Sequence, residues 1–322
     1  MQPSLVEDGN VTTVSEFVLW GISEDPEQQK FLFGLFLLMY TVTLAGNLGL
    51  IFLIRIYPKI HTPMYFFLSH LSFLDSCYSS VTAPRILRDL LSENKIISWS
   101  GCMTQLGLFI VLASAELYLL ASMAYDRYVA ICNPLLYPVL MSSWACTSLV
   151  AVCYTVGLIN SLTVTSSISK LSFCRANMVK SFFCDIRPLL ALSCSDTQVC
   201  NILVFAFGAF IQMTSLLVIV VSYTFIIIAI MRIRLAEGKR KAFSTCASHM
   251  TTVSLFYGTL IFIYLRPTSN SAPNQDQVVS IFYTMVIPML NPVIYSLRNQ
   301  EVKQALKKVL SRILYKGQVV QT

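Results

Sequence analysis

Seven apolar segments of about membrane-spanning length constrain this sequence more than any other feature. They cover residues 31–56, 63–87, 103–124, 145–166, 202–231, 251–265 with an approach from 239, and 278–297. A helix of about 20 residues crosses a hydrocarbon core of roughly 30 Å. Backbone polar groups must be hydrogen-bonded within the chain at that depth, and helices satisfy this condition. We therefore predict an all-α membrane protein, a seven-transmembrane helix bundle over residues 30–297.

The low charge content excludes several classes of protein. Charged residues make up 12% of the 322 residues and hydrophobic residues 55%, whereas a soluble domain carries about 25% charged residues. This is too little charge to cover a water-facing surface. The composition disfavours a soluble enzyme, a nucleic-acid-binding protein and a disordered scaffold, and it indicates membrane lipid as the surroundings.

The distribution of charge predicts the orientation. If residues 1–29 lie outside, 14 of the 23 Lys and Arg residues lie on the cytosolic side and nine on the outer side. Three acidic residues then lie inside and eleven outside. This is the positive-inside asymmetry, so we predict an extracellular tail over residues 1–29. The net charge of +7 reflects this topology rather than nucleic-acid binding. One domain accounts for the whole chain.

The segment after the seventh apolar run has helical periodicity. Val302, Ala305, Leu306 and Val309 recur at helical spacing, with lysines between them. We predict an amphipathic helix over residues 298–314 on the inner leaflet, followed by a cytoplasmic tail over 315–322. A solvated tail helix is the alternative.

Four of the ten cysteines lie on the predicted outer side, where disulfides persist. They are Cys102, Cys174, Cys184 and Cys194. Spacing leaves all three possible pairings open. Asn10 begins an Asn-Val-Thr glycosylation sequon in the outer tail.

Two carboxylates lie inside predicted membrane helices. Asp75 is in the second helix and Glu116 in the third, with Asn47 and Asn291 at comparable depth in the first and seventh. Such carboxylates are costly and often functional. They either form a shared internal site for a cation or water, or form a protonated, hydrogen-bonded pair that fixes packing.

The triplet Asp126-Arg127-Tyr128 ends the third apolar run. An acidic residue next to an arginine at the inner membrane edge can be a simple ion pair. It can also be a latch that releases Arg127 when the bundle rearranges.

The context of this triplet resembles a known family. Residues 123–137 read Met-Ala-Tyr-Asp-Arg-Tyr-Val-Ala-Ile-Cys-Asn-Pro-Leu-Leu-Tyr, which is similar to the signature of olfactory receptors within the rhodopsin-like G-protein-coupled receptors. Other family motifs follow in order at Gly46-Asn47, residues 63–69, Ser222-Tyr223, residues 241–249, Phe256-Tyr257-Gly258-Thr259 and residues 288–299. The resemblance spans about residues 15–312 and is to the tetrapod, airborne-odorant class.

The resemblance implies a plasma-membrane receptor that activates a stimulatory, olfactory-type heterotrimeric G protein to raise cyclic AMP. It implies the disulfides Cys102–Cys184 and Cys174–Cys194 and a glycan at Asn10. An inner switch would comprise Asp126, Arg127, Tyr128, Tyr223 and Tyr295. Asp75, Glu116, Asn47 and Asn291 match the family's internal sodium-type site, and no other cofactor is expected.

The resemblance also implies a pocket for a small volatile odorant. Helical phase from Arg127 gives the face of the third helix that lines this pocket in the family. The predicted lining residues are Phe109, Ile110, Ala113, Ser114, Phe207, Gly208, Ile211, Leu260, Ile261, Tyr264, Ile281 and Thr284. This lining is apolar, with a few hydroxyls to orient one polar group. Ordinary helix packing is the alternative for each residue.

Two positions depart from the family pattern. Tyr154 replaces a tryptophan that is general in rhodopsin-like receptors, and Ser181 replaces a histidine common in odorant receptors. The second departure argues against a metal-assisted odorant site.

The sequence also bears on two other classes of function. A channel or transporter is the alternative, because Asp75 and Glu116 could line an ion path. An enzyme is disfavoured because the sequence has no His-Glu-x-x-His, Gly-x-Ser-x-Gly or phosphate-loop motif.

Overall fold

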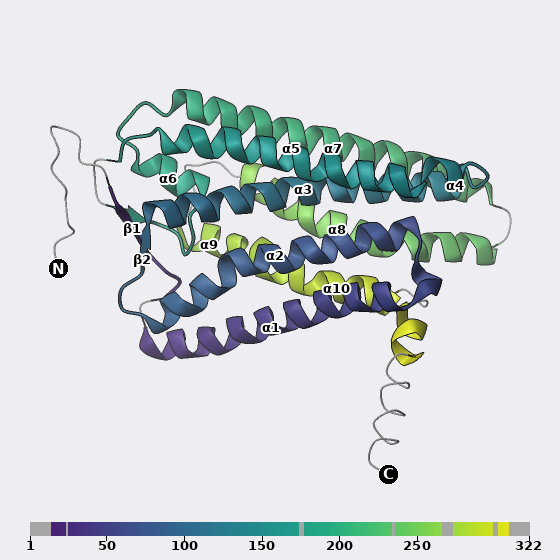
Figure 1. Ribbon diagram of the computed structural model, residues 1–322, viewed down its shortest axis with the longest axis horizontal. Helices are drawn as coiled ribbons and strands as arrows, with labels where there is room; N and C mark the ends of the chain where they lie inside the picture. The colour runs from purple at the N-terminus through teal and green to yellow at the C-terminus, as the bar shows by residue number, and fades with distance from the viewer. Residues whose placement is uncertain are drawn as a thin grey trace, which may run out of the picture.

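Long helices lie side by side along the molecule (Figure 1). The computed structural model describes residues 14–23, 25–173, 177–233, 236–265, 273–298 and 302–308. The long helices are α1 (Pro26–Ile56), α2 (Pro63–Leu91), α3 (Trp99–Cys132), α5 (Ser143–Ser169), α7 (Gln198–Arg232) and α8 (Ala236–Leu265). A last rod follows, made of α9 (Pro273–Ile281), the π-helical turn η3 (Phe282–Val286) and α10 (Ile287–Arg298).

Each predicted apolar segment falls within one of these helices or within the last rod. Five helical segments of the described chain are long and apolar enough to cross a membrane: Pro26–Ile56, Trp99–Cys132, Ser143–Ser169, Gln198–Arg232 and Gln277–Tyr295. α2 and α8 have 29 and 30 residues but are more polar. The prediction of a helical membrane protein is confirmed. The composition of α2 and α8 does not show that these two helices also cross the membrane.

Short polar side chains begin several of the helices. Asp25 accepts a hydrogen bond from the Glu27 backbone N–H at 3.0 Å at the start of α1. Ser98 accepts one from Gly101 at 3.1 Å at the start of α3. These caps satisfy N–H groups that have no partner within the helix.

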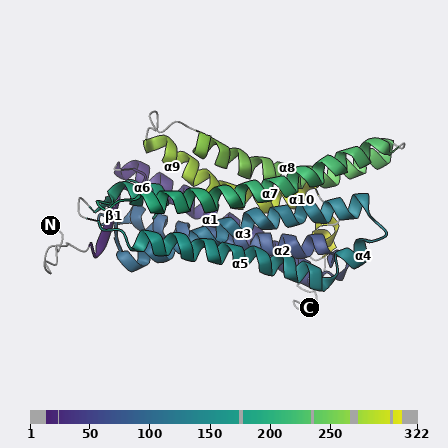
Figure 2. The ribbon, with the colours of Figure 1, turned by 90° about the horizontal axis from the view of Figure 1, so that it is seen from above.

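α3 is the central helix and packs against α2, α5 and α7. Figure 2 shows it between α5 on one side and α8 and α9 on the other. The approach to α5 is especially close at Gly157, where a Cβ atom would lie 2.6 Å from the Val111 carbonyl oxygen. Glycine is therefore required for this helix pair to pack as it does.

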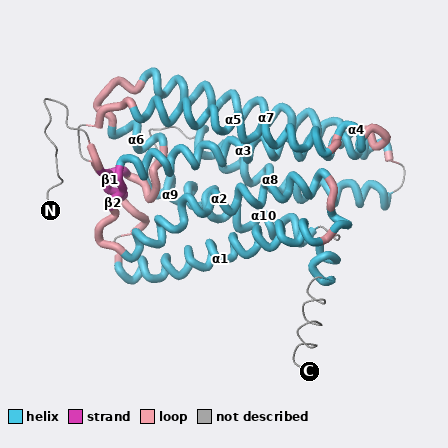
Figure 3. The backbone as a smooth tube through the Cα atoms, in the orientation of Figure 1, coloured by secondary structure: helices cyan, strands magenta, loops and turns pink. Residues whose placement is uncertain are grey.

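A three-stranded sheet covers one end of the bundle (Figure 3). Its strand order is β2 (Ile96–Ser98), β1 (Glu16–Leu19) and β3 (Met178–Val179). β1 pairs antiparallel with β2, with Phe17 opposite Ile97, and parallel with β3, with Leu19 opposite Val179. Phe17 and Leu19 are buried, so the sheet anchors the amino-terminal segment to the helices. The short helix α6 (Ile186–Leu192) lies at the same end.

The opposite end carries the turn η1 (Pro58–Ile60), the short helix α4 (Tyr137–Leu140) and a helical segment over residues 302–308. In that segment Val302 and Ala305 are buried, whereas Lys303 and Lys307 are exposed. Residues 302–308 are helical, and the predicted amphipathic helix over 298–314 stays a prediction beyond them. Residues 309–314 lie outside the described residues, as does Asn10.

Candidate functional site

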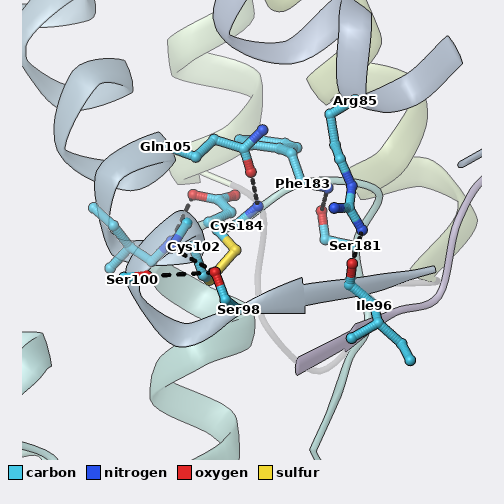
Figure 4. Close-up of a disulfide and its surroundings, with 12 residues drawn as sticks. Arg85, Ile96, Ser98, Ser100, Cys102, Gln105, Ser181, Phe183 and Cys184 are labelled. Carbon is cyan, nitrogen blue, oxygen red and sulfur yellow. Dashed lines mark hydrogen bonds between the residues drawn. A yellow bond between two sulfur atoms is a disulfide. The ribbon is translucent and has the colours of Figure 1, made fainter. Parts of the chain in front are cut away.

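A disulfide fixes the loop between α5 and α7 to the outer end of α3 (Figure 4). It joins Cys102 and Cys184, whose Cα atoms are 5.4 Å apart, and this predicted pairing is confirmed. Gln105 accepts a hydrogen bond from the Cys184 backbone N–H at 3.0 Å and donates one to the Val81 carbonyl at 3.0 Å. The bond and Gln105 together connect the loop to α3 and α2.

The second predicted pairing is only partly visible. Cys194 takes part in a disulfide, but Cys174 lies outside the described residues. The pairing of these two cysteines therefore stays a prediction.

An ion pair supports the same end of the molecule. Arg85 donates to Asp89 at 2.7 Å, one helical turn away on α2, and to the Ile96 carbonyl of β2 at 2.9 Å. Figure 4 shows Arg85 reaching Ile96 beside the disulfide loop.

Phe109, a predicted pocket residue, is the centre of an aromatic cluster. Its ring centroid lies 5.1 Å from that of Tyr78, 5.3 Å from Phe183 and 5.8 Å from Tyr283. These partners come from α2, the disulfide loop and η3. The cluster therefore connects α3, the loop and the last helical rod in the outer half of the bundle.

Two predicted pocket residues use their hydroxyls within the protein. Ser114 accepts a hydrogen bond from the side-chain amide of Asn160 at 2.9 Å. Thr284 donates to the Ser280 carbonyl at 2.7 Å. The carbonyl oxygen of Asn160 has no partner although it is buried. Ser114 and Asn160 are thus the polar groups on this part of α3 and α5.

The remaining pocket predictions are mostly apolar and inward-facing. Ile110 and Ile211 are buried, and Ala113, Phe207, Gly208, Leu260 and Ile281 are half-buried. The side chains of Ile261 and Tyr264 lie outside the described residues.

Two hydrogen bonds link the helices beneath this region. The hydroxyls of Tyr118 on α3 and Thr214 on α7 are 2.8 Å apart. Those of Ser215 on α7 and Tyr257 on α8 are 2.7 Å apart. A rearrangement in the outer half can therefore reach α8 through Tyr257. Tyr257 belongs to the motif Phe256-Tyr257-Gly258-Thr259, but the motif alone indicates no role for this residue.

The structure brings only part of the predicted polar cluster into hydrogen-bonding contact. Asn291 donates to both carboxylate oxygens of Asp75, at 3.1 and 3.0 Å. Asn47 instead donates to the backbone carbonyls of Thr43 and Pro288, each at 3.0 Å. Asp75 is therefore hydrogen-bonded to the seventh-helix asparagine, and the first-helix asparagine fixes the backbone of α10.

Three oxygens of this group have no hydrogen-bond partner although they are buried. They are Oε1 of Glu116 and the side-chain carbonyl oxygens of Asn47 and Asn291. The described residues contain no cluster of three or more His, Cys, Asp or Glu residues. Any cation here would depend on amide oxygens as well as the two carboxylates.

Tyr223 and His249 form the main polar contact at the inner end of α7 and α8. The Tyr223 hydroxyl lies 2.8 Å from Nδ1 of His249, and Nε2 of His249 lies 3.1 Å from the Leu120 carbonyl oxygen. A carbonyl only accepts, so Nε2 carries the hydrogen and Nδ1 accepts from Tyr223. The fully buried imidazole thus joins α3, α7 and α8.

Asp126 forms its hydrogen bond with a residue other than Arg127, and the switch role of the two residues stays a prediction. Asp126 accepts a hydrogen bond from the Tyr137 hydroxyl of α4 at 2.9 Å, and no salt bridge joins it to Arg127 in the described chain. Burial and the nearby Asp126 raise the pKa of Tyr137, so its hydroxyl keeps the proton it donates. The carboxylate therefore fixes α4 to α3, and Nε of Arg127 has no partner.

The other predicted switch residues lie nearby in the same half. Tyr128 packs against Phe225 of α7, with ring centroids 5.8 Å apart. Tyr295 is buried, and its hydroxyl has no partner.

His249 is the functional candidate that sequence reasoning missed. It is one of three histidines in the chain and stands within the motif at residues 241–249. A lone histidine in the inner part of an apolar helix was the available signal. Its two partners come from segments 26 and 129 residues away, so the motif alone did not identify them.

Comparisons with known proteins show the family of this chain. The sequence matches the family model described as olfactory receptor over residues 36–313. It is 53% identical to mouse "Olfactory receptor 5G9" over 305 residues, which cover 95% of this chain and 97% of the relative. It is 50% identical to human "Olfactory receptor 5AR1" over 303 residues, which cover 94% and 98%. It is also 52% identical to human "Olfactory receptor 8J2", with 94% and 96% covered.

Proposed function

Because the chain belongs to the olfactory receptor family, we propose that it is an odorant receptor of the plasma membrane with its amino terminus outside the cell. It binds a small, mostly apolar volatile molecule and activates a stimulatory, olfactory-type G protein that raises cyclic AMP. The observation that carries this proposal is a sequence identity of 50–53% with olfactory receptors over about 95% of the chain. The protein is a receptor and not an enzyme.

All seven helical rods cross the membrane in this proposal. The polarity of α2 does not oppose this, because its polar side chains are mostly turned inward. Ser72, Asp75, Ser76, Ser79 and Thr82 are all buried. The mean hydropathy of a helix includes all of its side chains. Lipid contacts only the side chains that point outward from the bundle. For α8, the polar residues lie mainly before Thr251, at the inner edge.

The ligand binds between the outer halves of α3, α7, α8 and the last rod. Phe109 and its aromatic partners, with Ile110 and Ile211, provide apolar contacts worth about 0.8 kcal/mol per buried methylene. Ser114 and Thr284 orient one polar group of the odorant, together with Tyr264. A charged ligand is disfavoured, since the described lining residues carry no charge.

Ligand and G protein are coupled through the helices. An odorant that displaces the Phe109 cluster changes the packing around Tyr257 and its hydrogen bond to Ser215. Movement of α8 then changes the contact between Tyr223 and His249 and the region around Arg127. Both partners favour the same helix arrangement, so each increases the affinity of the other.

A sodium ion fits the chemistry of the buried polar group. Glu116, Asn47 and Asn291 each present a buried oxygen without a partner, and oxygen ligands suit hard cations. These residues and Asp75 would hold the ion, which would supply positive charge between the two carboxylates. The protein's own contribution is the Asn291–Asp75 contact, which orients that carboxylate. A channel or transporter is not favoured, because the relatives are receptors.

A cyclic-AMP reporter screen in cells that express the receptor tests the proposal. The panel contains volatile alcohols, aldehydes, ketones, esters and acids, and cells with empty vector give the background. We expect a dose-dependent response to at least one uncharged, mostly apolar compound.

Two variants make the screen specific. Arg127→Ala should abolish the response while surface delivery remains measurable, because the inner switch loses its cation. Arg55→Ala removes an exposed arginine from the inner end of α1 and should respond normally. A response that survives in Arg127→Ala at equal surface expression would contradict the switch assignment.

A further inference from the structure

A hollow lies between α8 and the last helical rod, outside the predicted pocket. Its volume is about 330 Å³. The lining residues are Ser254, Leu255, Gly258 and Thr259 on α8 and Val278, Val279 and Phe282 on α9 and η3. None belongs to the predicted odorant pocket. We call this hollow the α8–η3 groove.

The groove opens on the outer surface of the helix bundle. Val278 is 62% exposed and Phe282 42% exposed, and Ser254 and Gly258 are also exposed. In a membrane receptor this surface contacts lipid, and the groove is continuous with the lipid-facing side chains around it. Figure 2 shows α8 and α9 together at one side of the molecule. With the helices spanning the bilayer as proposed above, an occupant can enter the groove from the hydrocarbon phase.

Gly258 keeps the groove open. A Cβ atom built at Gly258 would have no neighbouring atom within 4 Å. At Gly157, by contrast, a Cβ would meet the backbone of α3. The two glycines therefore act differently: Gly157 permits close packing, and Gly258 leaves space that packing does not use. A volume of about 330 Å³ lies within the range of small-molecule sites, about 300–1,000 Å³.

The inner side of the groove adjoins the predicted odorant pocket. Tyr283 follows the groove residue Phe282, and its ring packs on Phe109. Tyr257 precedes Gly258 and is hydrogen-bonded to Ser215. The π-helical turn at Phe282–Val286 adds a residue to the helical turn at this place, a feature that recurs at functional sites.

The described outer end of the bundle is covered by protein. The three-stranded sheet buries Phe17 and Leu19 there. Beneath it Phe182 and Phe183 are buried, with ring centroids 5.0 Å apart. A small apolar molecule concentrates in the bilayer rather than in water. The groove is a hollow that such a molecule can meet from the lipid side.

We propose that the α8–η3 groove is an access site, which binds an apolar odorant dissolved in the bilayer before that odorant reaches the Phe109 cluster. The proposal rests on the proposed function for the identity of the occupant. The apolar walls bind the hydrocarbon chain. The inward path passes between Tyr257 and Tyr283, so a ligand in the groove already touches the helices that carry these residues.

Photolabelling of the full-length receptor in lipid nanodiscs tests this site without any signalling readout. The probe is an eight-carbon aliphatic alcohol with a diazirine in its chain, and the labelled residues are identified by mass spectrometry. We expect labelling at groove residues, especially Val278 and Phe282, that excess 1-octanol suppresses. Gly258→Leu should reduce the octanol-suppressible labelling about tenfold. The leucine side chain fills the space of two or more methylenes of the probe, whose burial contributes about 0.8 kcal/mol each to binding.

A matched variant and a second substitution keep the test specific. Gly49→Leu places the same side chain at an exposed glycine of α1 that also has nothing within 4 Å, and it should label like the wild type. Val278→Trp fills the groove from the opposite wall and should act like Gly258→Leu. Labelling that octanol does not suppress, or that both filling variants leave unchanged, would show that ordinary lipid occupies the groove and would overturn the proposal. The photolabelling result does not depend on G-protein coupling, so it fails or succeeds separately from the cyclic-AMP screen.

Discussion

Tyr223 of α7 and His249 of α8 are stacked as well as hydrogen-bonded. Their ring centroids are 5.7 Å apart with 12° between the planes, and the oxygen and nitrogen are 2.8 Å apart. The same imidazole reaches the Leu120 carbonyl of α3 with its other nitrogen. One side chain thus holds three helices together at the end of the bundle assigned to the G protein.

The first prediction concerns this contact. Tyr223→Phe and His249→Phe each keep an aromatic ring but remove the hydrogen bond. Each should change the equilibrium between receptor states about fivefold, equivalent to roughly 1 kcal/mol for one buried hydrogen bond. Agonist-evoked cyclic AMP should fall in both variants. The double variant should behave like His249→Phe, because that substitution already removes the Tyr223 contact together with the bond to the Leu120 carbonyl.

Dose–response curves at matched surface expression measure this effect. Tyr125→Phe serves as the control, since it removes a phenol on α3 near the same end. Effects that add in the double variant would mean that Tyr223 and His249 act separately.

The second prediction concerns the buried carboxylates. Glu116→Gln keeps the shape of the side chain and removes its charge. If a cation binds between Glu116 and Asp75, basal cyclic AMP in the variant should no longer respond when choline replaces sodium. The wild type and Glu93→Gln, which alters an exposed residue before β2, should both remain sensitive. If basal cyclic AMP in Glu116→Gln depends on sodium as it does in the wild type, no cation binds between Glu116 and Asp75.

The third prediction concerns the disulfide loop. Cys184→Ser breaks the bond to Cys102 and should cost about 2–5 kcal/mol of folding free energy. Surface delivery should fall strongly, as should that of Cys102→Ser, with no further loss in the double variant. Antibody staining of intact cells gives the surface fraction. Cys77→Ser alters a free, half-buried cysteine and should be delivered normally; comparable loss there would point to general sensitivity to cysteine replacement.

The fourth prediction concerns the contact between α3 and α5. Gly157→Ala adds a methyl group 2.6 Å from a backbone oxygen that cannot move independently of its helix. We expect a loss of about 1–3 kcal/mol of stability and a lower midpoint in thermal unfolding of the purified receptor. Gly49→Ala should not be destabilised, because its Cβ meets no atom within 4 Å. An unchanged midpoint in Gly157→Ala would show that the two helices can separate at little cost.

The helices were predictable because each apolar segment must be long enough to cross the hydrocarbon core of the membrane. The second predicted segment, 63–87, lies inside α2 and shares its first residue, and the fifth, 202–231, lies inside α7. The sheet was not predicted, because strands of two to four residues have no period to detect. Their partners lie in other parts of the chain, and only the closed bundle brings these together.

The candidate site was predictable in its residues more than in its contacts. Asp75 and Asn291 were expected together and are hydrogen-bonded. Asp126 was expected near Arg127 but bonds to Tyr137, because side chains of adjacent helical residues point in different directions. A phenol from the next short helix was better placed to donate. The sequence shows which types of residue lie at a given depth in the helix bundle. Which of them form hydrogen bonds with each other depends on how each helix is rotated about its axis.

The outer sheet also has a consequence for biosynthesis. Its central strand, Glu16–Leu19, is made before either partner, and Met178–Val179 follows only after α5 has been synthesised. Until then Phe17 and Leu19 lack the strand that completes their cover. A chain truncated before Met178 would therefore leave these two side chains accessible to chaperones. Closure of the sheet thus marks the stage at which a nascent chain has all three segments of its outer end in place.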